Sequence, residues 1–477
     1  MSIIMSEPSS THEASDGAPL GQRVGLVMAA IRQRIAARTL VAGARLPSIR
    51  GFAVAMGVSK STVVEAYDRL AAEGVIQSRR GSGFFVAGQL QPLLLDEIGP
   101  RLERAVDPLW VSRQSLETGD DVLKPGCGWL PPEWMPQASL RRALRSLGRS
   151  ADAALADYGS PLGLPALRQV LARRLIERGV EAAPGQILLT DSTTHAIDLV
   201  CRFLLEPGDK VLVDDPCYFN FRALLRAHRA DVIGVPRTPT GPDVAAFAEA
   251  LAQHRPRLYL TNSALHNPTA GVLSPLVAHR ILKLAEAHDL TIIEDDVFSD
   301  FEEEPGARLA AFDGLQRVVQ VGGFSKTLSA SIRCGYIVAQ ADWTDGLAHP
   351  RIAAAIGHGR LAAELVLAML KDGFYRKHVE QLRERLARAR GRTGQRLRAL
   401  GITPWIEPQG GMFLWCRLPD GTDTTELARR ALADNILLAP GNVFSPSQAA
   451  GSFLRFNVAQ CADERIFTTL AASLDRL

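Results

Sequence analysis

The stretch GGFSKTLSASIRCGY, residues Gly322–Tyr336, contains Lys326 and follows directly on a short β-rich run. Similar runs recur along the chain, and several are separated by helical stretches such as Ala196–Leu205 and Pro275–His288. Strands that alternate with helices predict a large, mostly parallel sheet with helices on both faces. The expected strands are Ile187–Thr190, Val211–Asp214, Asp231–Val235, Leu258–Asn262, Thr291–Asp295, Val318–Gly322 and Tyr336–Val338.

Changes of pattern along the chain predict its division into domains, since 477 residues are too many for one ordinary domain. A long charged helix at Gly373–Leu400 is expected to lead into a small α+β subdomain with strands at Met412–Arg417 and Leu454–Val458. The linker is expected to contain helices at Leu93–Glu103 and Pro108–Leu116 and to pack on another part of the protein. The expected parts are a disordered N-terminus over 1–19, a compact module over 20–88, a linker over 89–122 and an α/β domain over 123–477, with a large sheet domain at about 150–375 and a small subdomain at about 376–477.

The charge of the chain is unevenly distributed. The net charge is only +3, but Leu20–Gly88 holds ten Lys or Arg residues against three acids, which leaves +7 there and −4 elsewhere. A short basic module on an otherwise acidic chain favours a polyanionic partner, and a solvated basic surface is the alternative.

Cysteine usage and hydropathy exclude several classes. The six cysteines lack CxxC or Cys/His ligand spacing, so we expect neither a disulfide framework nor a metal site. The sequence shows no apolar run of transmembrane length and no signal-peptide core at its start. We therefore expect a soluble cytoplasmic protein with no membrane partner.

The basic module has the pattern of three helices and a hairpin. A first helix carries an apolar stripe that begins at Val24 and ends at Ile35. Ser48 is a plausible N-cap of a second helix through Met56, and Ser59 of a third helix that Gly74 ends. The following residues, VIQSRRGSGFFV at Val75–Val86, predict a two-stranded wing with a basic tip.

The stretch LPSIRGFAVAMGVSKSTVVEAYDRLAAEGVIQSRRGSGFFV resembles the winged helix-turn-helix of GntR-family regulators. Where some members of that family carry a second guanine-reading arginine, this chain has Val64. The alternative is a helical bundle with a hairpin and no ligand. The resemblance implies contacts with double-stranded operator DNA from Arg45, Arg50, Lys60, Ser61, Thr62, Arg79, Arg80 and Gly83.

Lys326 has the surroundings that pyridoxal phosphate (PLP) requires. A buried lysine with a destabilised ammonium can form a Schiff base, and the cofactor also needs a phosphate cradle, an acid at its pyridine nitrogen and a partner for its ring hydroxyl. Asp295 ends the apolar strand TIIED, so it is expected at the carboxyl edge of the sheet. Asn267 lies in HNPTAG, and Thr190–His195 begins a helix that can bind phosphate. Taken singly, Asp295 could equally be a strand-end cap.

From Lys124 to Leu477 this order of residues resembles class I/II aminotransferases of fold type I, and the whole chain resembles the MocR subfamily of GntR regulators. The resemblance implies a multidomain protein: a winged helix-turn-helix, an α/β PLP-dependent transferase domain and a small α+β subdomain. It also implies a homodimer, because Tyr158 in DYGSPLGLPALR matches a tyrosine that reaches the phosphate of the neighbouring subunit. The implied roles are Lys326 as Schiff-base lysine, Asp295 at the pyridine nitrogen, Asn267 at the ring hydroxyl, Tyr218 over the ring, Ser192, Thr193, Ser325 and Arg333 at the phosphate, and Arg455 at a substrate carboxylate.

Three departures from the aminotransferase pattern bear on function. Gly323 replaces a hydroxyl residue, Ser192 replaces the glycine of the phosphate loop, and Val297 and Phe298 stand where many members carry a tyrosine for the ring hydroxyl. The missing phenol favours a regulator that senses PLP or a small amino-containing effector. The rival is an aminotransferase that transfers an amino group to a 2-oxo acid, and a third possibility is a scaffold that only dimerises.

Overall fold

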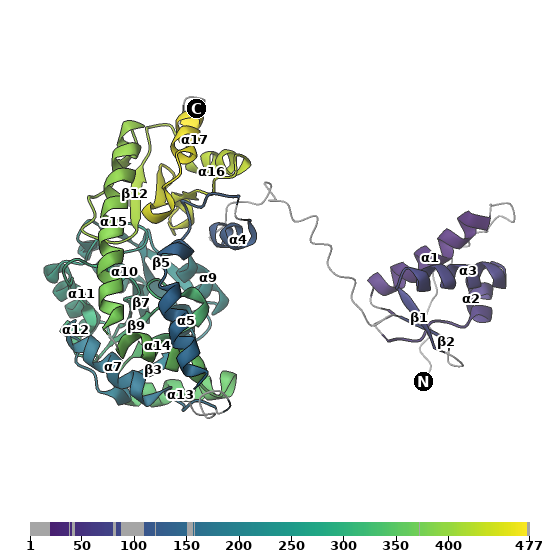
Figure 1. Ribbon diagram of the computed structural model, residues 1–477, viewed down its shortest axis with the longest axis horizontal. Helices are drawn as coiled ribbons and strands as arrows, with labels where there is room; N and C mark the ends of the chain where they lie inside the picture. The colour runs from purple at the N-terminus through teal and green to yellow at the C-terminus, as the bar shows by residue number, and fades with distance from the viewer. Residues whose placement is uncertain are drawn as a thin grey trace. The chain divides into compact units, whose positions relative to one another are not determined.

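The computed structural model describes residues 20–37, 39–40, 43–79, 83–86, 109–119, 121–149, 156, 158–371 and 373–474. The chain divides into two compact units between Arg101 and Leu102 (Figure 1). The expected disordered N-terminus and the expected helix at 93–103 lie outside the described residues.

The first unit has the predicted helices and hairpin. Its elements are α1 (Leu20–Ala36), α2 (Ile49–Met56), α3 (Lys60–Ala72), β1 (Ile76–Arg79) and β2 (Gly83–Val86). Ser48 and Ser59 cap α2 and α3 by accepting hydrogen bonds from the amides of Gly51 and Thr62. Tyr67 is fully buried between the helices, and its hydroxyl donates to the carbonyl of Pro47 at 3.0 Å.

The second unit contains the predicted sheet, in the order β3-β10-β9-β8-β7-β4-β5-β6. Strands β9, β8, β7, β4 and β5 run parallel, whereas β10 pairs antiparallel with both of its neighbours and β6 pairs antiparallel with β5. The strands are β3 (Ile187–Thr190), β4 (Lys210–Asp215), β5 (Asp231–Thr238), β6 (Gly241–Pro242), β7 (Leu258–Thr261), β8 (Thr291–Asp295), β9 (Val318–Gly323) and β10 (Gly335–Val338).

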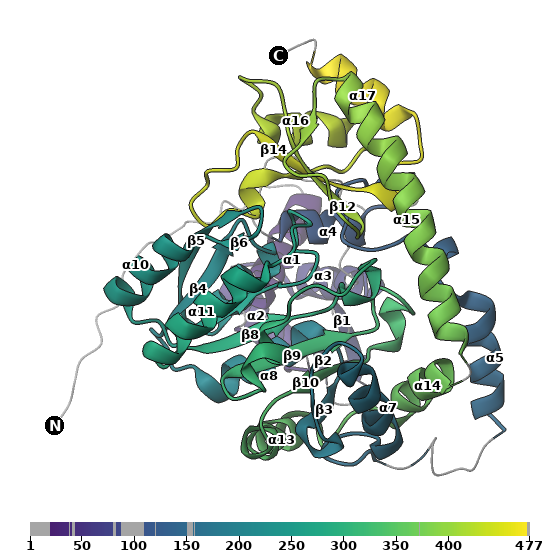
Figure 2. The same cartoon turned by 90° about the vertical axis from the view of Figure 1, so that its left-hand side faces the viewer.

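Helices cover both faces of this sheet (Figure 2). In β4, for example, Leu212 packs into one core, whereas Val211 and Val213 pack into the other, as the two-residue period of a strand requires. On the face of Leu212 lie α7 (Pro165–Ile176), α10 (Val244–His254), α11 (Pro275–Ala287), α12 (Leu309–Asp313) and α14 (Arg360–Lys371), and on the other face lie α8 (Thr193–Leu204), α9 (Phe219–Ala227) and α13 (Ala341–Ala355).

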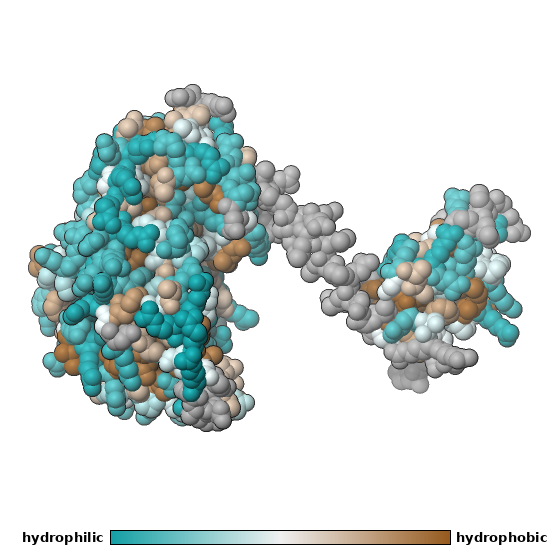
Figure 3. Space-filling model, in the orientation of Figure 1, coloured by the Kyte–Doolittle hydropathy of each residue, from teal (hydrophilic) through white to brown (hydrophobic). Residues whose placement is uncertain are grey.

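The C-terminal part forms the predicted small α+β subdomain. Helix α15 (Phe374–Ala399) leads into a four-stranded antiparallel sheet of order β11-β12-β14-β13. Its strands and helices are β11 (Thr403–Pro404), β12 (Phe413–Arg417), α16 (Thr424–Ala433), β13 (Ala439–Pro440), β14 (Phe453–Asn457) and α17 (Arg465–Leu474). Among the described residues no helix is both long and apolar enough to cross a membrane, and the visible face of the second unit is mostly hydrophilic (Figure 3).

The second helix expected in the linker is present, and it packs on the protein as predicted. Helix α4 (Trp110–Glu117) packs through Trp110 and Val111 against Phe219 of the large sheet domain and Trp415 of the small subdomain. The chain from Leu109 onward therefore belongs to the second unit, because these apolar side chains are buried there.

An extended segment joins α4 to the sheet domain along the small subdomain. The amide of Leu123 donates to the carbonyl of Asn435, and the amide of Leu437 donates to the carbonyl of Leu123, both at 2.8 Å. The amide of Gly126 then donates to the carbonyl of Leu437 at 2.8 Å. These backbone hydrogen bonds fix the path of residues 123–126 against the small subdomain.

Gly126 lies too close to the neighbouring backbone for any side chain. A Cβ atom there would stand 2.5 Å from the carbonyl carbon of Leu438 and 2.6 Å from the amide nitrogen of Ala439. We expect Gly126→Ala to lower the free energy of unfolding by about 1–3 kcal/mol, since backbone must shift to admit the methyl group. Urea unfolding followed by circular dichroism measures the loss. The control is Gly185→Ala, whose added Cβ meets no atom within 4 Å, and equal midpoints for the two variants would contradict the prediction.

Candidate functional site

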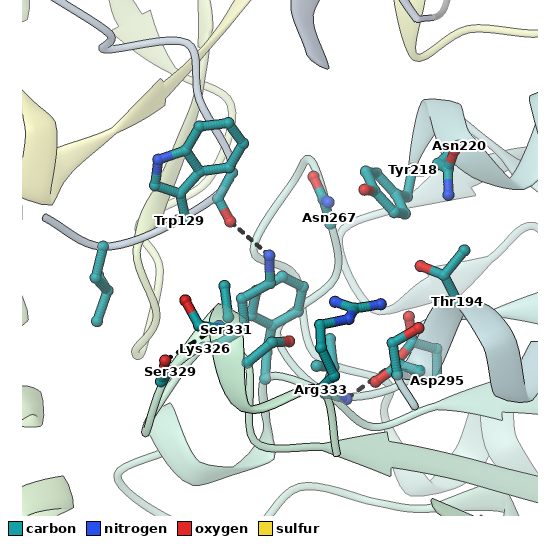
Figure 4. A pocket seen from close by; sticks show the side chains of 18 of the residues that line it. Trp129, Thr194, Tyr218, Asn220, Asn267, Asp295, Lys326, Ser329, Ser331 and Arg333 are labelled. Atoms are coloured by element: carbon teal, nitrogen blue, oxygen red, sulfur yellow. Dashed lines mark hydrogen bonds between the residues drawn. The ribbon is translucent and has the colours of Figure 1, made fainter. Parts of the chain in front are cut away.

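A cavity of about 650 Å³ lies at the carboxyl edge of the large sheet. Its walls include Asp295 at the end of β8, Lys326 just after β9, and Thr193 just after β3. Residues far apart in the sequence converge here because loops at the carboxyl ends of the strands meet at one edge. Figure 4 shows Lys326 in the middle of this cavity.

Lys326 projects toward the backbone of a distant segment. Its Nζ atom donates a hydrogen bond to the carbonyl of Gly128 at 2.7 Å. Burial, with a smaller contribution from the Arg455 guanidinium, lowers the pKa of Lys326 to about 8. A substantial fraction of this amine is therefore neutral near physiological pH, which is the form that attacks a carbonyl carbon.

Asp295 shows the opposite shift for the same physical reason. Burial raises the pKa of its carboxyl group to about 7, although Oδ1 accepts a hydrogen bond from the amide of Val297 at 3.1 Å. A buried carboxylate of this kind is stabilised by a cationic group placed opposite it. The site thus fits a ring whose nitrogen carries a proton.

The start of α8 offers a cradle for a phosphate group. Ser192 caps this helix by accepting from the amide of His195 at 3.0 Å, and helix N-termini attract anions. The buried Thr193 Oγ1 atom has no hydrogen-bond partner among the described residues. Ser325 and Arg333 line the same cavity, and Arg333 is exposed there. An orphaned hydroxyl beside a guanidinium and a helix N-terminus fits an anion with several acceptor oxygens.

The structure explains the departure at Gly323. A Cβ atom at this position would stand 2.8 Å from Thr193 Oγ1. The hydroxyl of Thr193 therefore takes up the space into which a side chain at position 323 would extend.

Tyr218, Asn267, Val297 and Phe298 all line the cavity. Tyr218 is half-buried at the start of α9 and packs edge-on against Phe221, with ring centroids 5.4 Å apart. Phe298 packs edge-on against Phe413 at 5.5 Å, so this position supplies no hydroxyl. Asn267 is the candidate partner for a ring hydroxyl, because its amide nitrogen is not used by the hydrogen bond that Oδ1 accepts from Arg455.

Arg455 is buried behind the cavity and does not form part of its wall. Only 1% of the residue is exposed, and its guanidinium lies between the rings of Phe413 and Phe444. Nη1 donates to Asn267 Oδ1 at 2.8 Å and Nη2 to the carbonyl of Gly126 at 2.7 Å. Burial lowers the pKa of Arg455 to about 10. Both terminal nitrogens of Arg455 are therefore engaged, and a carboxylate that binds this guanidinium has to replace one of these hydrogen bonds.

The structure does not bring Tyr158 to the cavity, since 80% of this residue is exposed. Sequence reasoning also missed several wall residues that come from elsewhere in the fold. Trp129, Thr194, Asn220, Ser329 and Ser331 line the cavity, as do Ser115 and Leu116 of α4. The glycine pair in GCGWL, residues 126–130, was the one available signal, because such spacing permits a close approach of backbone.

The exposed surface of the first unit carries most of the expected DNA contacts. Lys60 and Ser61 are exposed at the start of α3, and Arg45 and Arg50 are exposed beside it. Thr62 differs from the expectation: it is 1% exposed, and its hydroxyl pairs with Ser59 Oγ at 2.8 Å, so its side chain belongs to the helix cap. Arg45 extends over the wing, since a Cβ atom on Gly83 would lie 3.6 Å from its Nε. The side chain of Arg79 and all of Arg80 lie outside the described residues.

The lowered pKa of Lys326 predicts the pH dependence of its reaction with an added aldehyde, for which PLP is the probe. The capture rate should rise by about tenfold per pH unit below pH 8 and level off above it, because the neutral amine reacts. Borohydride reduction at timed intervals followed by peptide mapping measures the label on Lys326. Arg455→Met should raise the midpoint, since a neighbouring cation is removed, and Arg455→Lys should not. A midpoint near pH 10 in the wild type, or label on another lysine, would contradict the assignment.

Two family models match this chain. Residues 25–86 match the bacterial regulatory proteins of the gntR family, and residues 129–472 match aminotransferase class I and II. The uncharacterized HTH-type transcriptional regulator YdcR of Escherichia coli (strain K12) is 30% identical over 91% of this chain and 94% of its own. The HTH-type transcriptional regulator NorG of Staphylococcus aureus (strain USA300) is 26% identical over 88% of this chain and 97% of its own.

Solved structures resemble the second unit. The alpha-aminoadipate aminotransferase LysN of Thermus thermophilus, in complex with N-(5'-phosphopyridoxyl)-L-leucine, is 27% identical with a TM-score of 0.70, over 79% of this chain and 97% of its own. The kynurenine aminotransferase of Pyrococcus horikoshii shares the fold, with a TM-score of 0.71 and 23% identity. The match covers 80% of this chain and 98% of that enzyme's chain. The chain therefore belongs to the MocR-type regulators, in which a GntR helix-turn-helix domain is joined to an aminotransferase class I and II domain of fold type I.

Proposed function

We propose that this protein is a PLP-dependent transcription regulator that senses a small amino-containing effector. Its first unit binds a double-stranded operator, and its second unit holds the cofactor on Lys326. One observation carries the proposal: Lys326 and Asp295 line the same cavity, and the Lys326 amine donates a hydrogen bond to the carbonyl of Gly128. The pKa of this amine is near 8.

The geometry of the cavity supports the cofactor roles that the family resemblance implies. Bound PLP supplies an aldehyde that condenses with amines and a ring that withdraws electrons. Asp295 would hold the proton on the ring nitrogen, Asn267 would bind the ring hydroxyl, and Tyr218 would cover one ring face. The phosphate would be held at the start of α8 by Ser192, Thr193, Ser325 and Arg333. The exposed Tyr158 would reach the phosphate of a second subunit, which implies a homodimer.

A continuous path connects this site to the linker. The carbonyls of Gly126 and Gly128 accept hydrogen bonds from Arg455 and Lys326 respectively. Residues 123–126 are fixed to the small subdomain by backbone hydrogen bonds, and α4 precedes them. Binding of the cofactor by Lys326 would break the hydrogen bond to Gly128. Binding of an effector carboxylate by Arg455 would break the hydrogen bond to Gly126. We infer that the change moves α4, which begins at the end of the linker.

The rival function is amino-group transfer, and the retained set of Lys326, Asp295 and Asn267 favours it. Two observations favour the regulator. Phe298 removes a hydroxyl that would otherwise tune the ring oxygen, and Arg455 is covered by the Gly126–Gly128 segment. Each would slow a reaction that must accept, convert and release substrates repeatedly. Neither prevents the binding of an effector.

Operator recognition gives the first test. Arg50→Ala and Lys60→Ala should each weaken specific binding by about 1–3 kcal/mol if the side chain reads a base edge. The matched control is Arg69→Ala, an arginine on the same helix as Lys60 that pairs with Glu65 at 2.6 Å. Fluorescence anisotropy with a labelled operator measures the affinities. A fragment from Lys124 to Leu477 that bound the operator as tightly as the full chain would contradict the assignment to the first unit.

Coupling between the site and the operator tests the proposal itself. With full-length protein loaded with PLP, the effector should change operator affinity by about 5–150-fold, that is about 1–3 kcal/mol. Trp110→Ala should keep the absorbance of bound PLP and its response to effector but lose most of the change in operator affinity. The control is Arg113→Ala on α4, whose side chain is half-exposed and pairs with Glu117. Two results together would favour the aminotransferase function instead. The protein would convert a common amino acid many times per second, and no ligand would change its affinity for the operator.

A further inference from the structure

The cavity extends well beyond the groups assigned to the cofactor. In Figure 4, Tyr218, Thr194 and Arg333 lie on one side of Lys326, and Trp129, Ser329 and Ser331 lie on the other. The total volume of about 650 Å³ is in the range of sites for small organic molecules, ~300–1,000 Å³. The side that contains Trp129 is therefore available to an effector whose amine points at Lys326.

The charged groups of the wall are all committed to the cofactor. Among the described residues that line the cavity, the charged ones are Asp295, Lys326 and Arg333. The residues that follow Trp129 in the chain and line the cavity begin with Leu130, Pro132 and Met135, and Ser329 and Ser331 lie on the same side of Lys326 as Trp129 (Figure 4). This side of the cavity is apolar, with a few neutral hydrogen-bonding groups.

Arginines close to this wall bind elsewhere. The Arg385 guanidinium stacks on the ring of Trp134 at 4.1 Å from the ring centroid. Arg141 is exposed and contacts the Gln137 side chain at 3.5 Å. Arg455 is engaged by Asn267 and Gly126. None of the three forms part of the cavity wall.

The described residues that this chain contributes around Trp129 are uncharged, and this selects among effectors. A second carboxylate or a side-chain ammonium would lose its hydration on entry and gain no ion pair. An apolar side chain instead gains free energy, because it leaves water for contact with Trp129, Leu130 and Met135.

We propose that the effector is an amino acid or amine with an uncharged, apolar side chain between leucine and phenylalanine in size. This inference rests on the proposed function, because it takes the effector amine to lie at Lys326. Its side chain packs against Trp129, Leu130 and Met135. The hydroxyls of Ser329 and Ser331 can form hydrogen bonds with one neutral polar group of the effector.

The test is a comparison of four probes on full-length, PLP-loaded protein. Leucine, phenylalanine, glutamate and lysine are titrated at one ionic strength, and both the visible absorbance and the operator affinity are recorded. Leucine or phenylalanine should give an apparent dissociation constant at least about tenfold lower than glutamate and lysine. Glutamate or lysine that bound as tightly as both apolar probes would overturn the inference and leave the proposed function standing.

A change of charge on the wall gives a second arm. Met135→Lys adds a cation beside the effector side chain, so it should lower the dissociation constant of glutamate relative to leucine by about tenfold. The matched control, Met135→Leu, keeps the wall apolar and should keep the preference for leucine over glutamate. The Met135→Lys protein must still bind PLP and melt at the wild-type temperature. If its ratio of the dissociation constants for glutamate and leucine is then unchanged, the assigned subsite is overturned. If no amino acid or amine altered the spectrum or the operator affinity of the wild type, the proposed sensing function would fail, and this inference with it.

Discussion

The carbonyl groups of Gly126 and Gly128 accept hydrogen bonds from two basic side chains, and the geometry of the site depends on this arrangement. Arg455 donates to the first carbonyl and Lys326 to the second. Gly126 can approach so closely only because it lacks a side chain, since a methyl group there would overlap the backbone of Leu438 and Ala439. A single backbone segment thus contacts both the expected Schiff-base lysine and the expected carboxylate anchor.

Burial acts on the charged groups of the cavity in opposite directions. It lowers the pKa of Lys326 and raises the pKa of Asp295, because low-dielectric surroundings disfavour the charged form of each. Without a ligand, both groups are therefore held in an environment that costs free energy. A cofactor that neutralises Lys326 and places a cation opposite Asp295 recovers part of this cost, which links cofactor binding to the stability of the second unit.

The sequence predicted most of the fold because its signals are local. The strand Thr291–Asp295 has the predicted limits, and the caps Ser48 and Ser59 are where hydroxyl residues precede apolar helices. Asp295, Lys326 and Thr193 could be placed at one edge because they follow strands of a mostly parallel sheet. The burial of Thr62, the hydrogen bonds that hold Arg455 and the partners against which α4 packs were not predictable, since each depends on which distant residues pack together. The roles of the site residues are still predictions.

Coupling to DNA requires that the effector bind unequally to two arrangements of the protein. In the arrangement that the structure shows, Arg455 is closed off by the Gly126 carbonyl and held between Phe413 and Phe444. Under the proposed function, an effector carboxylate that engages Arg455 would replace the hydrogen bond to Gly126, so it would favour an arrangement in which this segment has moved. That difference would be the free energy available to shift α4, which contacts both subdomains through Trp110 and Val111. An enzyme would lose catalytic rate to such a rearrangement in every cycle, whereas a regulator uses it once per binding event.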